Sequence, residues 1–315
     1  MRRSYPVDLH CHTTVSDGML SPSAVVQLAA RCGVQALAIT DHDSIAGWKE
    51  AEAEGCVQGV KIVRGVEINT DWEKTEVHIL GYFADQRVPR SGREDFLSKE
   101  EMSPAAGGYS LVRLEQKLAD IQSKRRERLE AIIEKMRGVG VALTWEEVQR
   151  YASGPSIGRP HVARALVDRE IAATTGEAFD LFLKPGAPAY VPRYKLDPCE
   201  AITAIVEAGG VAVLAHPGKS LWGRTSQGAS ALDDQIPAWI EAGLRGLEVC
   251  HPSHTPEQIA DYILMADRWN LIPTGGSDFH AENEQSESIG SYGADWPVLE
   301  AMGRETLIRN KKHMF

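Results

Sequence analysis

The sequence predicts an α/β fold: a distorted, seven-stranded (β/α)7 barrel of the TIM type that carries an inserted helical lobe. Two observations lead to this prediction. Seven short segments rich in apolar and β-branched residues alternate with amphipathic helical stretches along the 315 residues, which is typical of parallel strands joined by helical crossovers. The alternation stops between residues 84 and 195, so we expect that interval to form the lobe.

Each of the seven segments has the length and composition of a buried strand. In chain order they are residues 5–9, 36–40, 61–67, 77–82, 211–215, 246–249 and 271–274. We expect them to form a parallel sheet that is closed or nearly closed, so that the carboxyl ends of the strands meet at one mouth of the barrel.

Amphipathic helices are expected between the strands. The clearest one covers residues 21–33, because Ser21 suits the N-cap, Pro22 suits the first turn and Gly33 is a stop signal. Two more are expected over residues 197–208 and 256–269.

The chain is expected to divide into a barrel, residues 1–83 and 196–315, and a lobe of residues 84–195 that covers the active site. The lobe contains a charged helical stretch over residues 114–137, followed by shorter helical segments. Residues 87–110 at its start are rich in Gly, Ser, Pro and charged residues, which predicts a mobile loop.

Composition narrows the function classes. The formal net charge of −10 argues against broad, sequence-independent binding of nucleic acid, because such binding needs surplus Lys and Arg. No segment approaches the roughly 18 apolar residues of a membrane span, and the N-terminus lacks the apolar region of a signal peptide. We therefore expect a cytoplasmic protein without membrane contact. The five scattered cysteines predict reduced thiols, and a small anionic substrate stays compatible with the charge.

Potential metal ligands follow almost every predicted strand. In strand order they are His10 and His12, Asp41 and His42, Glu67, His78, His216, His251 and His254, and Asp278 and His280. A single histidine at a strand end is more often a structural residue, but functional groups of parallel barrels gather at the carboxyl ends of the strands. The repeated coincidence therefore predicts a metal centre at this mouth.

The residue types narrow the choice of metal ion. Imidazoles and carboxylates without thiolates suit Zn, Mn or Fe rather than Ca or Mg alone. His10 and His12 are two residues apart, so on an extended strand both point to the same side and can reach one cation. Glu67 is a carboxylate that can bridge two cations, and a separation of about 3.5–4 Å between cations suits displacement at phosphorus.

Six motifs carry a family resemblance. DLHCHTTVSDG, ITDHD, GVEI, HILGY, LAHPG and GSDFH occur in this order and resemble the motifs of the PHP (polymerase and histidinol phosphatase) family, within the broader amidohydrolase-like metallohydrolases. SIGRPHVARALV, LFLKPGAPAYV and EVCHPSHT are most similar to the branch with 3′,5′-nucleotide bisphosphate phosphatases and a 5′-to-3′ exoribonuclease.

The resemblance implies two to three divalent cations. The implied ligands are His10, His12, Glu67 and Asp278 for the first, Glu67, His78 and His216 for the second, and Asp17, His42 and His280 for the third. Some family members have His where this chain has Asp17. The hard oxygen of Asp shifts the expectation to Mn²⁺, with Zn²⁺, Fe²⁺ or Mg²⁺ as alternatives.

Further residues are candidates for catalysis and substrate binding. Asp278 is expected to orient the attacking hydroxide and accept its proton, and His254 to contact a phosphate of the substrate or assist the leaving alcohol. Arg159, at a predicted helix start, can present a bidentate fork to phosphate, and Arg125 and Lys184 are further phosphate-binding candidates. His161 is expected to pack a helix and His251 to brace its loop.

The predicted function is hydrolysis of a nucleotide phosphate monoester by attack of a metal-bound hydroxide on phosphorus. The resemblance implies the 3′-phosphate of a 3′,5′-bisphosphate nucleotide as the target, giving a 5′-mononucleotide and phosphate. Three alternatives stay open: a 5′-to-3′ exoribonuclease on short RNA, a hydrolase of carbon–nitrogen bonds, and a non-catalytic metal-binding regulatory module.

Overall fold

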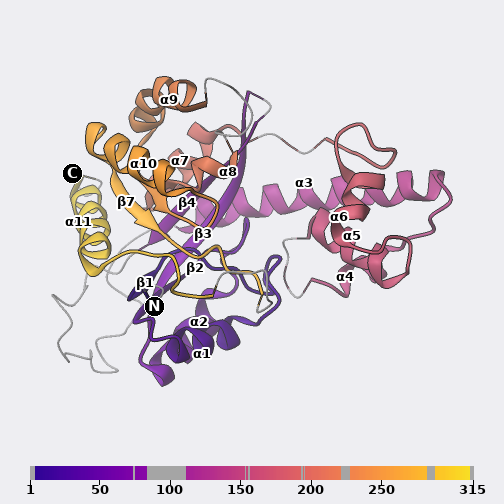
Figure 1. The fold of residues 1–315 in the computed structure, drawn as a ribbon, viewed down its shortest axis with the longest axis horizontal. Coiled ribbons are helices and arrows are strands. Elements are labelled where there is room, and N and C mark those ends of the chain that lie inside the picture. Colours follow the sequence, from indigo (N-terminus) through magenta and orange to yellow (C-terminus); the bar gives the residue numbers. More distant parts are fainter. Residues whose placement is uncertain are drawn as a thin grey trace.

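The computed structural model describes residues 4–73, 75–83, 111–152, 154, 157–192, 194, 196–220, 228–281 and 288–312. The predicted mobile loop at residues 87–110 lies outside these residues. Figure 1 shows a strand-rich body surrounded by helices, from which one long helix extends and carries a group of short helices at its far end. No helix of the described residues is long and apolar enough to cross a membrane.

The body is built on one seven-stranded sheet with the strand order β1 to β7. The strands are β1 (Val7–Asp8), β2 (Ala36–Ile39), β3 (Lys61–Trp72), β4 (Thr75–Phe83), β5 (Val211–Leu214), β6 (Leu244–Cys250) and β7 (Ile272–Gly275). After β1, the Leu9 amide donates to the Gly275 carbonyl at 3.2 Å, and an isolated parallel bridge pairs Cys11 with Phe279. The last and first strands therefore meet, and the predicted distorted (β/α)7 barrel is confirmed.

One part of the strand prediction is wrong: the sheet is not parallel throughout. β4 pairs antiparallel with both β3 and β5, whereas the other neighbours are parallel. β3 ends at Trp72 and β4 begins at Thr75, and so short a connection makes a hairpin because a parallel crossover needs a dozen or more residues. Asn69 consequently lies opposite His78, and the start of β4 shares an end of the barrel with the carboxyl ends of the parallel strands.

The three predicted helices are present. They are α1 (Pro22–Arg31), α7 (Pro198–Glu207) and α10 (Pro256–Arg268), with Ser21, Asp197 and Thr255 as N-caps whose side chains accept backbone N–H bonds. The body also contains α2 (Trp48–Gln58), α8 (Pro217–Ser220), α9 (Gly228–Ala242) and α11 (Trp296–Lys312). A Cβ at Gly81 of β4 would lie 2.8 Å from Ile205 of α7, so glycine allows this helix to pack closely on the sheet.

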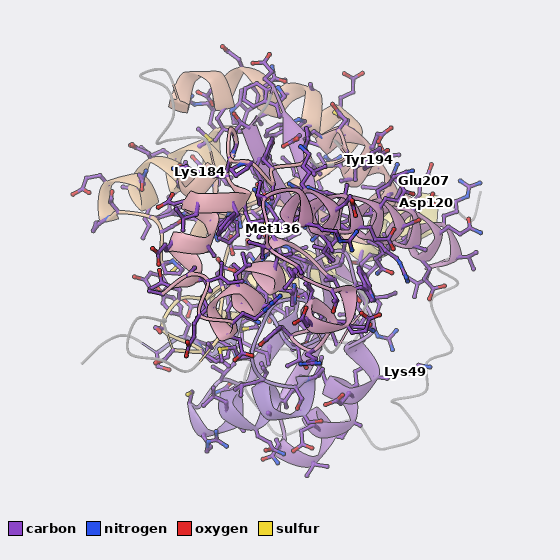
Figure 2. All side chains as sticks on the ribbon, turned by 90° about the vertical axis from the view of Figure 1, so that its right-hand side faces the viewer. Lys49, Asp120, Met136, Lys184, Tyr194 and Glu207 are labelled. Carbon is purple, nitrogen blue, oxygen red and sulfur yellow. The ribbon has the colours of Figure 1, made fainter. Side chains whose placement is uncertain are left out.

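Helix α3 (Leu111–Gly138) belongs to two hydrophobic clusters. Its first half, including Leu118, packs in the cluster beneath β3, β4 and α7, whereas its second half, including Ile132, packs in a separate cluster. That second cluster joins α3 to α4 (Trp145–Gln149), α5 (Arg159–Asp168), α6 (Thr175–Ala178) and the π-helical turn η1 (Phe179–Leu183). From here on, the lobe means the described residues 122–192, which form part of the lobe predicted over residues 84–195. Figure 2 looks onto its outer side.

Candidate metal centre

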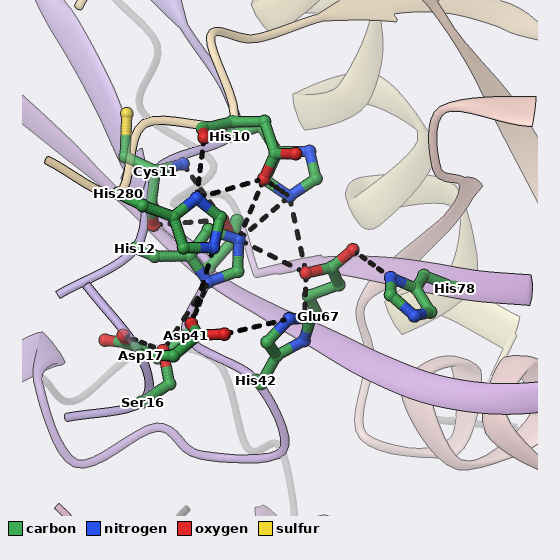
Figure 3. A network of polar contacts seen from close by, with 12 residues as sticks. His10, Cys11, His12, Ser16, Asp17, Asp41, His42, Glu67, His78 and His280 are labelled. Atoms are coloured by element: carbon green, nitrogen blue, oxygen red, sulfur yellow. Dashed lines mark hydrogen bonds and ion pairs between the residues drawn. The ribbon is translucent and has the colours of Figure 1, made fainter. Parts of the chain in front are cut away.

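The centre is formed where the loops after β1, β2 and β7 meet the middle of β3 and the start of β4 (Figure 3). His10 and His12 follow β1, His42 follows β2, and Asp278 and His280 follow β7. Glu67 lies within β3, and His78 reaches the same place because β4 runs in the opposite direction. The topology therefore brings together side chains that are up to 270 residues apart in the sequence.

Four side chains surround the first position that could hold a cation. The Nε2 atoms of His10 and His12 lie 3.1 Å apart. Glu67 Oε2 lies 3.4 Å from the first and 3.2 Å from the second. Asp278 Oδ1 lies 3.5 Å and 3.3 Å from the same two nitrogens. The four ligand atoms that the resemblance implied for one cation thus converge on one point.

Glu67 also faces a second position through its other oxygen. Glu67 Oε1 lies 2.7 Å from His78 Nδ1 and 3.0 Å from His216 Nε2. One buried carboxylate therefore lies between two groups of imidazoles, which is the geometry expected of a bridging ligand.

The third group is more open. Asp17 Oδ1 lies 3.4 Å from His280 Nε2 and 3.6 Å from His12 Nδ1, and Asp17 Oδ2 lies 3.8 Å from His42 Nε2. The side chains of His42, Asp17 and His280 are 15%, 17% and 33% exposed, whereas those of His10 and His12 are fully buried. The centre is therefore reached from the side of the third group.

The carboxylates of the centre are held ionised. Burial alone would raise the pKa of Glu67, but the imidazoles of His42, His78 and His10 lower it well below its usual range. Burial acts in the same way on the pKa of Asp278, and Lys219 and His10 outweigh it, so that this pKa is also lowered well below its usual value. These two acids consequently offer negative oxygen ligands at neutral pH.

The imidazoles of the centre differ in whether their surroundings raise or lower their pKa. Burial lowers the pKa of His12, but hydrogen bonds to Asp278 and Glu67 raise it to about 10. The pKa of His78 is likewise raised to about 9, because Glu67 outweighs the effect of burial. Burial dominates at His216, whose pKa is lowered to about 3, so this imidazole is neutral and carries a free lone pair.

The donor set fits divalent cations. Asp17 Oδ1, at the third position, is buried and has no hydrogen-bond partner among the described residues. Buried polar atoms are rarely left unpaired, and a neutral imidazole nitrogen and a carboxylate oxygen are both ordinary metal ligands. Several groups of three or four His, Asp and Glu residues here have ligand atoms within 4.8 Å of one another.

Glu248, which the sequence reading did not select, supports two of these histidines. Its fully buried Oε1 lies 2.9 Å from His10 Nδ1, and its Oε2 accepts the His216 backbone N–H at 2.7 Å. An acceptor on Nδ1 leaves Nε2 of His10 free as a metal ligand. The available signal was an acid inside the apolar run GLEVC of β6, because a buried carboxylate needs a partner.

His251 and Lys219 also belong to the centre. Asp278 Oδ2 lies 2.9 Å from Lys219 Nζ and 3.3 Å from the buried His251 Nε2. The side chain of Lys219 is 51% exposed, so its charge is at the mouth of the barrel. Asp278 has φ +51°, an unfavourable conformation that functional sites often hold.

Two of the predicted substrate-binding residues, His254 and Arg125, are held by protein groups outside the cluster of possible ligands. His254 Nδ1 donates to the Val249 carbonyl at 2.8 Å and its Nε2 accepts the Gly218 N–H at 3.1 Å. Arg125 lies near the mouth, with Nε 2.6 Å from Asp43 Oδ2.

The other two candidates contact elements of the lobe. Arg159 donates to the Leu183 carbonyl and lies over the Phe179 ring. Lys184, on the outer part of the lobe (Figure 2), pairs with Asp180 at 3.1 Å and is not brought together with the cluster.

Comparison with known proteins identifies relatives that span the chain. A 3′,5′-nucleoside bisphosphate phosphatase from Chromobacterium violaceum is 34% identical over 300 residues, covering 95% of each chain. A 5′-3′ exoribonuclease from Haemophilus influenzae is 33% identical over 273 residues, covering 87% of this chain and 89% of the relative. Among solved structures, a protein from Bifidobacterium adolescentis assigned as a metal-dependent phosphoesterase has a TM-score of 0.79 and 30% identity, with 98% of each chain covered.

The nearly closed barrel, its cluster of side chains that could hold metal ions and these relatives define a metal-dependent hydrolase of phosphate esters. The PHP domain matches residues 8–139. The chain belongs to the PHP family, as its six motifs predicted.

Proposed function

We propose that the protein removes the 3′-phosphate of a 3′,5′-bisphosphate nucleotide and releases a 5′-mononucleotide and phosphate. The observation that carries this proposal is the convergence of His10, His12, Glu67 and Asp278 on one point, with the positive charge of Lys219 beside it. The bisphosphate substrate is supported by the 34% identity to a bisphosphate phosphatase over 95% of both chains.

We further propose three cation positions with the ligands that converge in the structure. They are His10, His12, Glu67 and Asp278 for the first, Glu67, His78 and His216 for the second, and Asp17, His42 and His280 for the third. Mn²⁺ suits this mixture of imidazoles and hard carboxylate oxygens. When bound, divalent cations neutralise charge on phosphoryl oxygens and lower the pKa of water toward neutrality.

Asp278 and the charged side chains near it orient the attacking water and bind the phosphate. Its carboxylate, kept ionised by Lys219 and the histidines, accepts a hydrogen bond from the attacking water and orients it toward phosphorus. Lys219 is half-exposed at the mouth and is placed to pair with the phosphate as well as with Asp278. Arg125 is the best placed of the predicted arginines, because it already reaches the loop that follows His42.

His254 acts as a brace in this proposal rather than as the proton donor. Both of its ring nitrogens are engaged by backbone groups, at Val249 and Gly218, so the leaving alcohol has no free nitrogen to meet there. Water reaching the open side at His280 can protonate the alcohol instead.

The test is a turnover assay with added Mn²⁺ that measures phosphate release from adenosine 3′,5′-bisphosphate and adenosine 5′-monophosphate, and mononucleotide release from a short 5′-phosphorylated RNA. We expect fastest turnover of the bisphosphate, and a fall of about 10²–10⁴-fold in kcat for Asp278→Asn, because the side chain loses the negative charge that orients the water and helps to hold the first cation. Asp180→Asn, in an exposed lobe pair, is the matched control and should be unchanged. Preferred cleavage of the RNA would replace this proposal by the exoribonuclease alternative, whose relative is 33% identical.

A further inference from the structure

We propose that the lobe sets the affinity of the third cation position, with Arg164 and His161 of α5 as positioning residues for Asp17. The inference rests on the cation positions of the proposed function, but not on the nucleotide substrate. It concerns the turn of residues 13–18, which carries Asp17, and the lobe side chains that hold the backbone of this turn.

Two side chains of α5 donate to consecutive carbonyls of the turn. Arg164 Nη2 donates to the Asp17 carbonyl at 2.8 Å. His161 Nε2 lies 3.0 Å from the Ser16 carbonyl, while its Nδ1 accepts the Gly158 N–H at 3.0 Å. Because Nδ1 accepts, Nε2 carries the proton and donates. His161 is therefore more than the packing residue expected from the sequence.

The lobe backbone also lies directly on this turn. A Cβ at Gly154 would overlap the carbonyl of Val15, so glycine is required for the close approach. From the barrel side, Asp41 accepts the Thr13 N–H at 2.8 Å and the Ser16 hydroxyl at 2.6 Å. The barrel thus secures the start of the turn, and the lobe secures the part that presents Asp17.

Helix α3 supports a second ligand of this position, His42, by a longer route. Gln122 Nε2 donates to the Asp43 carbonyl at 2.7 Å, and Arg125 pairs with the Asp43 carboxylate at 2.5 Å. The same carboxylate accepts the Asn69 side-chain amide at 3.0 Å, and that amide nitrogen lies 3.1 Å from His42 Nδ1. Two of the three ligands of the third position are consequently supported by lobe residues.

The first and second positions are supported from within the barrel. Glu248 of β6 holds both His10 and the backbone of His216, and Glu67 and His78 belong to one hairpin. This difference predicts a selective effect: loosening the lobe contact should weaken one cation and leave the others in place.

The experiment is a calorimetric titration of metal-free, full-length protein with Mn²⁺, combined with elemental analysis after dialysis. For Arg164→Ala we expect one class of sites to bind about 10–100-fold more weakly, the range seen when a residue supporting a ligand is removed, with the remaining sites unchanged. Arg169→Ala is the matched control, because Arg169 Nη1 donates to the Ala142 carbonyl inside the lobe. Its titration should match that of the wild type.

His42→Ala identifies the affected position. It should weaken the same class of sites, and the double variant Arg164→Ala/His42→Ala should leave the other classes unchanged, because both changes act on one cation. Arg164→Gln, which retains much of the side-chain stem, repeats the measurement if Arg164→Ala does not fold by circular dichroism. Equal weakening of all sites, or unchanged binding in a folded Arg164 variant, overturns the proposal. Neither outcome involves phosphate release, so a failure here is distinct from a failure of the proposed substrate.

Discussion

Glu248 illustrates how a residue that contacts no substrate can control the centre. Glu248→Gln keeps the size of the side chain but replaces one carboxylate oxygen by an amide, so it can no longer accept from His10 and from the His216 backbone with the same strength. We expect cation affinity to fall about 10–100-fold, measured by calorimetric titration. Glu241→Gln, at an exposed position of α9, is the control, and equal affinity in both variants would contradict the role of Glu248.

For His254 we predict an effect on stability rather than on cation affinity. His254→Ala leaves the Gly218 N–H and the Val249 carbonyl without their present partner, so the free energy of unfolding should fall by about 1–3 kcal/mol. Urea denaturation measures this change, and cation content should stay the same. A variant with unchanged stability and lost phosphate release would restore the sequence-based prediction that His254 assists the leaving alcohol.

At the scale of residues, the sequence predicted which side chains converge better than it predicted the residues that support them. The convergence of His10, His12 and Asp278 was predictable because metal-binding residue types follow successive strands, and barrel topology brings those positions together. The partner of Glu248 is 238 residues away, so only the folded chain reveals the pair. Arg159 and Lys184 were predicted as isolated positively charged side chains. The position of such a flexible charged group depends on neighbours in the fold, which no local sequence pattern specifies.

Among the elements, α3 connects the two hydrophobic clusters. Ile132 is fully buried in the lobe cluster, so Ile132→Ala should lower the free energy of unfolding by about 2–5 kcal/mol, measured by urea denaturation. Ile263→Ala is the matched control, because Ile263 is 50% exposed on α10, and it should cost less than about 0.5 kcal/mol. Similar small effects from both variants would mean that the lobe cluster adds little to stability.

The strands and capped helices were predicted closely because continuous apolar runs and N-cap residues are local signals. The antiparallel direction of β4 was not predicted, and the reason lies in the local sequence at the end of β3 and the start of β4. Residues 68–71 alternate between buried and partly exposed side chains, whereas the continuous apolar runs end at residue 67 and resume at residue 77. Even with the strands shortened in this way, residues 68–76 are too few for a parallel crossover, which needs a dozen or more residues, so the length of the connection was the signal for a hairpin.

For the molecule as a whole, the histidine pKa values predict proton release on binding metal. His12 and His78 have pKa values of about 10 and about 9, so both are protonated at about pH 7.5 in metal-free protein. Ligation needs the neutral imidazole, so each must lose its proton, and cation affinity should rise with pH until these values are reached. The pKa of His10 is also raised well above its usual value, because Glu248, Glu67 and Asp278 outweigh the effect of burial. Titration calorimetry in two buffers with different ionisation enthalpies should therefore show about three protons released, and a result of zero would contradict the assignment.

The reversed strand β4 has a consequence for how the protein folds. The β3–β4 hairpin joins residues that are close in the sequence, whereas every parallel pair of the barrel must first close a long loop. Local pairings lose less chain entropy and form earlier, so we expect the hairpin to precede the crossovers. Glu67 and His78 lie on this hairpin, only 2.7 Å apart. One acid and one imidazole of the centre can thus come together while most of the barrel is still unfolded.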